Sequence, residues 1–220
     1  MKKLLYITVN SKPESLSSSK TVGRAFVNRF LQRYPEFNLE EMDLYKEHIP
    51  ELKYNYFSGR NSIVDVLNMN KLNKEEKKEV NRIIQLCDQF KSADMYVIAA
   101  PMWSLSFPSQ LKAYIDCIVL DKKTIKIKKG EKPDCLLNDK KRGFVYIQSS
   151  GADLNMITEM IMDKGVHYVK GIMKALGIKN CEELLVDGTG STEEERLAAI
   201  KKAENHIDNI IDKAWPLEEE

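Results

Sequence analysis

Three consecutive serines are the residues of this sequence best suited to binding an anion. Ser17, Ser18 and Ser19 come just before a segment with helical periodicity, so their hydroxyls would join the free N–H groups of a helix start. Three hydroxyls at such a place suit a phosphate monoester. A single serine would suffice for an ordinary helix cap, so the pattern also permits that simpler interpretation.

The loop from Pro101 to Phe107 is unusually apolar for a place where a strand leaves its sheet. Its side chains include Met102, Trp103 and Leu105, which could lie against a flat apolar ligand. Alternatively, these side chains cap the hydrophobic core under a neighbouring loop, as most buried aromatic residues do. The loop therefore suggests a ligand surface without requiring one.

A third stretch, Ser149-Ser150-Gly151-Ala152, consists of small residues that let the backbone come close to a ring system. The sequence has no G-x-x-x-x-G-K-[ST] motif and no G-x-G-x-x-G after its first strand, which disfavours a triphosphate or a tightly held dinucleotide. It has no G-x-S-x-G either, which disfavours a hydrolase on the same fold. A phosphate site that faces an apolar surface fits a mononucleotide, and it describes flavin mononucleotide (FMN).

Each of these stretches follows an apolar segment with the pattern of a β-strand. Five strands are predicted, at Lys3–Val9, Leu39–Leu44, Met95–Ala100, Gly143–Gln148 and Glu183–Asp187. Helices are predicted at 22–34, 73–90, from Pro108 onward, 158–176 and 192–214. This alternation predicts an α/β protein with a flavodoxin-like, doubly wound, five-stranded parallel sheet of order 2-1-3-4-5. Its ligand site is the switch between strands one and three, where the serine loop and the apolar loop emerge.

The length of 220 residues favours a single domain over residues 1–220, with two irregular excursions at about 45–71 and 121–140. We expect a short helix near Ser62–Leu67 in the first excursion. In the second, the sequence TIKIK is expected to form a small hairpin arm.

The composition argues against several classes of partner. The 34 basic and 33 acidic residues nearly cancel, which gives no support to a nucleic-acid or membrane partner. No apolar run is long enough to span a membrane, and the first apolar run is too short for a signal peptide. The four cysteines and three histidines are scattered without ligand-like spacing, so neither a metal site nor a disulfide framework is expected. We therefore expect a cytoplasmic protein.

The stretch Ala99-Ala100-Pro101-Met102-Trp103, followed by Pro108 and by LKAYID at 111–116, resembles the signature of the FMN-dependent NADH:quinone oxidoreductases, also called azoreductases. Three departures accompany the resemblance. The family usually has Asn where this chain has Ser104, S-R-G-G where it has residues 149–152, and T-F-x-Y where it has residues 124–127. These departures leave the choice of acceptor, and of NADH against NADPH, open.

The resemblance implies a set of cofactor contacts. The FMN phosphate would lie on Ser11, Ser17, Ser18 and Ser19, and the ring system on Pro101, Met102, Trp103, Ser104, Leu105, Ser149, Ser150, Gly151 and Ala152. Candidates to stack on the substrate are Trp103, Phe107, Tyr54 and Tyr56, for which core packing is the alternative. A homodimer is implied by the resemblance alone.

The activity implied is a ping-pong cycle in which NADH or NADPH gives two electrons to bound FMN, and a quinone or azo compound then takes them. No side chain is expected to act as a catalytic group, because the flavin carries the chemistry. The alternative is a flavodoxin-type electron carrier without its own small-molecule substrate. Such carriers tend to be strongly acidic, and the balanced charge of this chain counts against that alternative.

Overall fold

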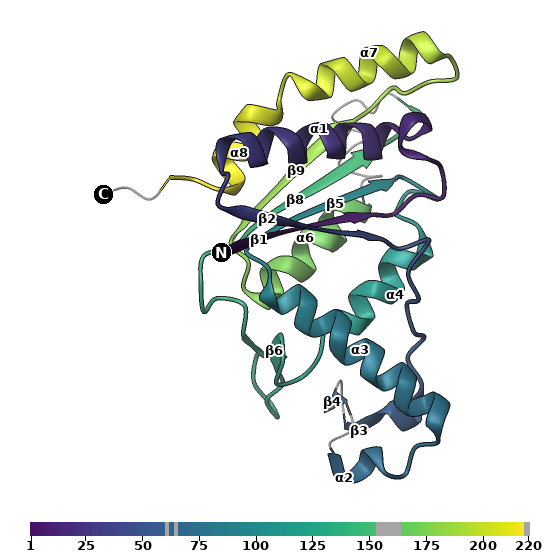
Figure 1. Ribbon diagram of the computed structural model, residues 1–220, viewed down its shortest axis with the longest axis vertical. Helices are drawn as coiled ribbons and strands as arrows, with labels where there is room; N and C mark the ends of the chain where they lie inside the picture. The colour runs from purple at the N-terminus through teal and green to yellow at the C-terminus, as the bar shows by residue number, and fades with distance from the viewer. Residues whose placement is uncertain (60–61, 64–65, 153–163, 218–220) are drawn as a thin grey trace.

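A computed structural model describes the chain except for residues 60–61, 64–65, 153–163 and 218–220, and its centre is a five-stranded parallel sheet (Figure 1). The strands are β1 (Lys2–Thr8), β2 (Phe37–Asp43), β5 (Met95–Pro101), β8 (Gly143–Ser149) and β9 (Asn180–Val186). Their spatial order is β2-β1-β5-β8-β9, which confirms the predicted order 2-1-3-4-5. β5 and β8 are buried along their whole length, as their nearly continuous apolar sequences require.

Helices cover both faces of the sheet. The described helices are α1 (Ser18–Arg33), α2 (Val66–Met69), α3 (Lys74–Ser92), α4 (Ser109–Ile118), α6 (Lys164–Leu176), α7 (Glu193–Glu204) and α8 (Ile207–Ala214), of which α2 lies in the first excursion, away from the sheet. Figure 1 shows α1, α7 and α8 on one face and α3, α4 and α6 on the other. Alternate residues of β1 enter the two cores: Leu4 and Tyr6 face α1, whereas Leu5 and Ile7 face α3.

Several local signals in the sequence are confirmed. Asn73 and Glu76 form a capping box at the start of α3, and Thr192 and Glu195 do the same for α7. Gly177 follows α6 in a left-handed conformation (φ 111°), which a glycine adopts without steric cost. The second excursion contains the expected hairpin, in which β6 (Ile125–Lys126) pairs with β7 (Asp134–Cys135).

Two expectations about helices are wrong. The predicted helix over 192–214 is interrupted at Asn205 and His206, between α7 and α8. The apolar residues on either side keep helical spacing, so the pattern alone could not reveal the bend that lets α8 pack beside β8 and β9. In the first excursion, Ser62–Ile63 is a strand, β4, paired with β3 (Phe57–Gly59), and the helix α2 begins only at Val66.

A further predicted helix falls partly outside the described residues. Of the range 158–176, the structure describes the part from Lys164 onward, which is helical as α6. The Pro108 helix begins one residue later than proposed, with Pro108 at the position before the first helical residue.

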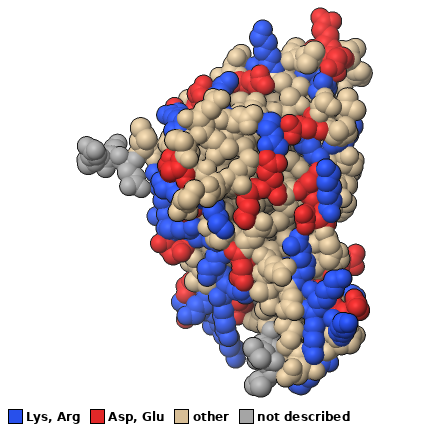
Figure 2. Space-filling model, in the orientation of Figure 1, with Lys and Arg blue, Asp and Glu red and all other residues tan. Residues whose placement is uncertain are grey.

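Acidic and basic side chains are both spread over the face of the molecule shown in Figure 2, in keeping with the balanced composition. No helix among the described residues is long and apolar enough to cross a membrane.

Gly23 lets α1 approach the strands whose loops carry the candidate site. A Cβ atom on Gly23 would lie 2.5 Å from Tyr6 Oη and 3.0 Å from Ala99 Cβ. We therefore expect Gly23→Ala to lower the free energy of unfolding by about 1–3 kcal/mol, because α1 would have to move away from β1 and β5. The matched variant is Gly171→Ala, where a Cβ meets nothing within 4 Å, and it should stabilise the protein by up to about 1 kcal/mol. Urea denaturation would measure both, and equal effects at the two glycines would contradict this account of Gly23.

Candidate functional site

Four loops meet at the carboxyl ends of the strands. They follow β1, β5, β8 and β9, and we call them the first, second, third and fourth loops. Thr8 lies beside Ala99, and Pro101 lies beside Ser149, so the loops after β1, β5 and β8 emerge side by side. The Met102 N–H donates to the Ser149 carbonyl (2.7 Å), which ties the second loop to the third. The loops surround a cavity of about 410 Å³. Its lining comprises Asn10, Ser11, Lys12, Leu16, Ser17, Ser18, Pro101, Met102, Trp103, Ser149, Ser150, Gly151, Thr189, Gly190, Ser191, Thr192, Glu193 and Arg196.

The start of α1 lines this cavity through Ser17 and Ser18. Ser17 is the N-cap, and its hydroxyl accepts hydrogen bonds from the Lys20 N–H (3.4 Å) and from Asn10 Nδ2 (2.9 Å). The first turn of α1 contains no acidic residue, so its positive dipole end keeps its capacity to attract an anion. The nearby start of α7 is different, because its first turn holds three glutamates and Glu195 accepts from two backbone N–H groups there. Of the two helix starts at the cavity, α1 is therefore the one whose backbone N–H groups suit an external anion.

The apolar loop after β5 also lines the cavity, and it forms a tight turn. Trp103 and Ser106 exchange two backbone hydrogen bonds, at 3.3 and 2.9 Å, across Ser104 and Leu105. Both central residues have positive φ, 50° for Ser104 and 60° for Leu105, which is the backbone of a type I′ turn. The turn presents Trp103 with 45% of its surface exposed. An exposed indole beside a cavity is a surface that a flat ring could cover.

The left-handed conformation of Ser104 carries a measurable cost. Asn and Gly adopt this region more readily than Ser, so Ser104→Gly and Ser104→Asn should each raise the free energy of unfolding by about 0.5–1 kcal/mol. The control is Ser109→Gly, at the start of α4, where the backbone is helical and glycine should destabilise. Thermal unfolding would measure the three variants, and a destabilised Ser104→Gly protein would contradict the assigned turn.

The third and fourth loops form one hydrogen-bonded wall. The Ser150 hydroxyl donates to the carboxylate of Asp187 (2.7 Å), and the Ser150 carbonyl accepts from the Thr189 N–H (3.0 Å). Gly188 and Gly190 both have positive φ, which turns the fourth loop back toward the third. The fourth loop, residues 188–192, was not predicted to belong to the site. Two glycines directly after the last strand are the signal that could have indicated it.

Most of the predicted cofactor residues lie around the one cavity. Those that line it are Ser11, Ser17, Ser18, Pro101, Met102, Trp103, Ser149, Ser150 and Gly151. The other four, Ser19, Ser104, Leu105 and Ala152, adjoin these residues without lining the cavity. Ser19 is fully buried, with its hydroxyl 3.3 Å from the Ser17 hydroxyl.

The predicted substrate-stacking residues are dispersed. Phe107 is half-buried and packs against Tyr168, with ring centroids 5.6 Å apart. Tyr54 is 98% exposed, Tyr56 is buried in the core, and neither lines the cavity. The tyrosine of the first excursion that does reach the apolar loop is Tyr45, whose ring centroid lies 6.4 Å from that of Trp103.

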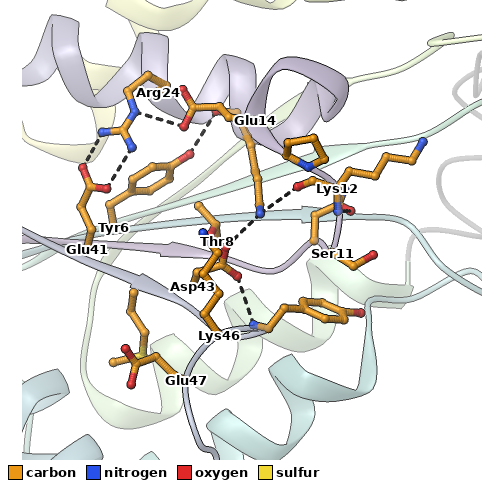
Figure 3. Close-up of a pocket in the computed structure, with 15 residues that line it drawn as sticks. Tyr6, Thr8, Ser11, Lys12, Glu14, Arg24, Glu41, Asp43, Lys46 and Glu47 are labelled. Carbon is orange, nitrogen blue, oxygen red and sulfur yellow. Dashed lines mark hydrogen bonds and ion pairs between the residues drawn. The ribbon is translucent and has the colours of Figure 1, made fainter.

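A second cavity of about 750 Å³ lies beside the first, between α1 and the ends of β1 and β2 (Figure 3). Its buried Lys20 donates to the Lys12 carbonyl (3.0 Å) and to the carboxylate of Asp43 (3.1 Å), which fixes the first loop to the end of β2. Arg24 makes a bidentate pair with Glu41 (2.5 and 2.9 Å), and these hydrogen bonds lower the pKa of the Glu41 carboxyl. Because Lys20 and all three guanidinium nitrogens of Arg24 already donate to carbonyl or carboxylate oxygens, these two cations offer a phosphate less than the start of α1 does.

Three of the four cysteines do not have the properties of catalytic nucleophiles. Burial raises the pKa of Cys87, Cys117 and Cys181 to about 12, so these thiols stay protonated near neutral pH. Among the described residues no group of three or more His, Cys, Asp or Glu side chains is arranged to hold a metal ion.

The sheet order defines a flavodoxin-like protein with a cavity at the switch point of its sheet. Residues 2–211 match the family model described as "Flavodoxin-like fold". A protein from Clostridium botulinum (strain Alaska E43 / Type E3), named FMN-dependent NADH:quinone oxidoreductase, is 65% identical over 98% of this chain and 100% of its own length. A protein of the same name from Ruminiclostridium cellulolyticum is 56% identical over 96% of this chain and 99% of its own length.

A solved structure of an FMN-dependent enzyme also resembles this chain in fold. It is the FMN-dependent NADH-azoreductase of Bacillus anthracis str. Ames Ancestor in complex with FMN, which is 26% identical to this chain. It superposes with a TM-score of 0.78 over 96% of this chain and 100% of its own. The chain thus belongs to the family of FMN-dependent NADH:quinone oxidoreductases.

Proposed function

We propose that this protein is an FMN-dependent oxidoreductase that passes two electrons from NADH to a quinone or an azo compound. The observation that carries the proposal is that the start of α1 and the Trp103 turn line one and the same cavity. The first suits a phosphate and the second suits a flat ring. The relatives named above support the assignment of FMN, of NADH and of the two classes of acceptor.

The residues present fit FMN. Ser17 and Ser18, with the first N–H groups of α1, would hold the phosphate. Met102 and Trp103 would lie against one side of the ring system, and the small residues Ser150 and Gly151 let the backbone approach another. When bound, FMN would supply the two-electron chemistry. The protein itself would bind and orient the FMN and shield it from water. No side chain is assigned as an acid or base.

The finer assignments also belong to this proposal. We expect a cytoplasmic homodimer. The apolar side chains of Trp103, Leu105 and Tyr168 are each more than a third exposed, and a partner subunit would cover them. Trp103 is the residue we assign to substrate contact, with Phe107 behind the same turn. Tyr54 and Tyr56 remain weaker candidates because neither lines the cavity.

Spectroscopy followed by anaerobic titration tests the proposed function. The purified protein should bind one FMN per chain and show flavin absorbance. Stoichiometric NADH should bleach that absorbance without another protein, and a quinone or azo dye should restore it. If NADH does not reduce the bound flavin, the proposed oxidoreductase activity is contradicted and the electron-carrier alternative is favoured. A chain that binds no FMN would contradict both.

A further inference from the structure

An arginine that the cofactor prediction did not include lines the same cavity as the serines assigned to the phosphate. Arg196 is in the first turn of α7, and α7 packs against α1 on the same face of the sheet (Figure 1). It lines the cavity together with Ser17 and Ser18. Its side chain is only 18% exposed, so its charge is less screened by water than that of a surface lysine.

The guanidinium of Arg196 is held in place yet has spare hydrogen-bonding capacity. Nε and Nη2 donate to the two carboxylate oxygens of Glu193, at 2.7 and 2.5 Å, which fixes the plane of the group. Nη1 is shielded from solvent and has no hydrogen-bond partner among the described residues. Buried donors in proteins nearly always have an acceptor, and none of the described residues supplies one to Nη1.

We propose that Arg196 recognises the phosphate of the cofactor and so selects FMN over riboflavin, an inference that rests on the proposed function. A phosphate monoester offers three acceptor oxygens and close to two negative charges, which complement the free Nη1 donor. Glu193 also lines the cavity, but its carboxylate is paired with Arg196 on the opposite edge of the guanidinium. Lys12 is the other cation of the lining, and it is exposed to solvent, where its charge is screened.

The test compares the binding of FMN and riboflavin to the full-length apoprotein by quenching of flavin fluorescence. Riboflavin has the same ring and lacks the phosphate, so the ratio of the two dissociation constants isolates phosphate recognition. Arg196→Ala should raise the Kd for FMN by about tenfold, the scale of one lost charge-assisted hydrogen bond, and change that for riboflavin less than twofold. Arg196→Lys keeps the charge and should recover part of the loss.

Arg24→Ala is the matched control, because Arg24 also pairs bidentately with a glutamate but lines the neighbouring cavity. Arg24→Ala should leave the ratio of the dissociation constants for FMN and riboflavin unchanged. Thermal unfolding of each apoprotein establishes that the variants are folded. If Arg196→Ala does not fold, the binding of FMN and riboflavin is compared in Arg196→Lys instead. If Arg196→Ala weakens FMN and riboflavin equally, or weakens neither, the inference is wrong while the proposed function stands. If the unmodified protein binds no FMN, the proposed function itself fails.

Discussion

Replacing Ser18 by aspartate should weaken FMN binding by a hundredfold or more without unfolding the protein. Ser18 is the first residue of α1, at the cavity end that we assign to the phosphate. A carboxylate about 5 Å from a phosphate charge costs about 3 kcal/mol at an effective dielectric constant of about 20, which is more than a hundredfold in Kd. The same carboxylate stabilises the positive end of the α1 dipole, so the fold should be retained.

Two comparisons make this prediction specific. Riboflavin should bind to the Ser18→Asp protein about as well as to the unmodified protein, because it has no phosphate to repel. Lys74→Asp, which places a carboxylate at the first residue of α3, should leave FMN binding unchanged. An FMN affinity that survives Ser18→Asp would show that the phosphate lies elsewhere. Isothermal calorimetry on the apoproteins would give both affinities.

Gly151→Leu should abolish the binding of FMN and riboflavin alike. Gly151 lines the cavity beside the second loop, and a Cβ on it would meet nothing within 4 Å, so a leucine side chain can extend into the open cavity. The φ of Gly151 is not positive, so the backbone accepts a leucine. We expect the Kd of each flavin to rise by a hundredfold or more, while the free energy of unfolding changes by less than about 1 kcal/mol.

The control for this variant is Gly171→Leu on α6, a glycine whose Cβ would also meet open space but which does not line the cavity. It should bind both flavins normally. Fluorescence quenching with each flavin measures the effect. Should Gly151→Leu still bind FMN tightly, the ring system does not lie against the third loop. The two variants therefore separate the ends of the cofactor, because Ser18→Asp spares riboflavin and Gly151→Leu does not.

The parts of the site that follow strands could be predicted because topology places them. Continuous apolar runs identify buried parallel strands, and the carboxyl ends of such strands share one edge, so Ser17, Trp103 and Gly151 had to lie near one another. No contact between their side chains was needed for that inference. The same reasoning gave the strand order.

What the sequence could not show depends on how helices and excursions pack. Arg196 reaches the cavity only because α7 lies against α1, a contact that no local pattern encodes. Tyr45 rather than Tyr54 or Tyr56 meets Trp103, because it follows the end of β2 closely while the other two lie in the irregular segment beyond. The bend at Asn205 is hidden for a related reason, since the spacing of the apolar residues continues through it.

A crystal structure of the FMN-loaded protein is the most direct measurement, because two neighbouring cavities compete as sites for the phosphate. We predict that the phosphate lies within hydrogen-bonding distance of the Ser17 and Ser18 hydroxyls and that the ring system lies between the Trp103 turn and Gly151. A phosphate bound instead beside Lys20 and Arg24 in the second cavity, or a ring remote from Trp103, would contradict the account.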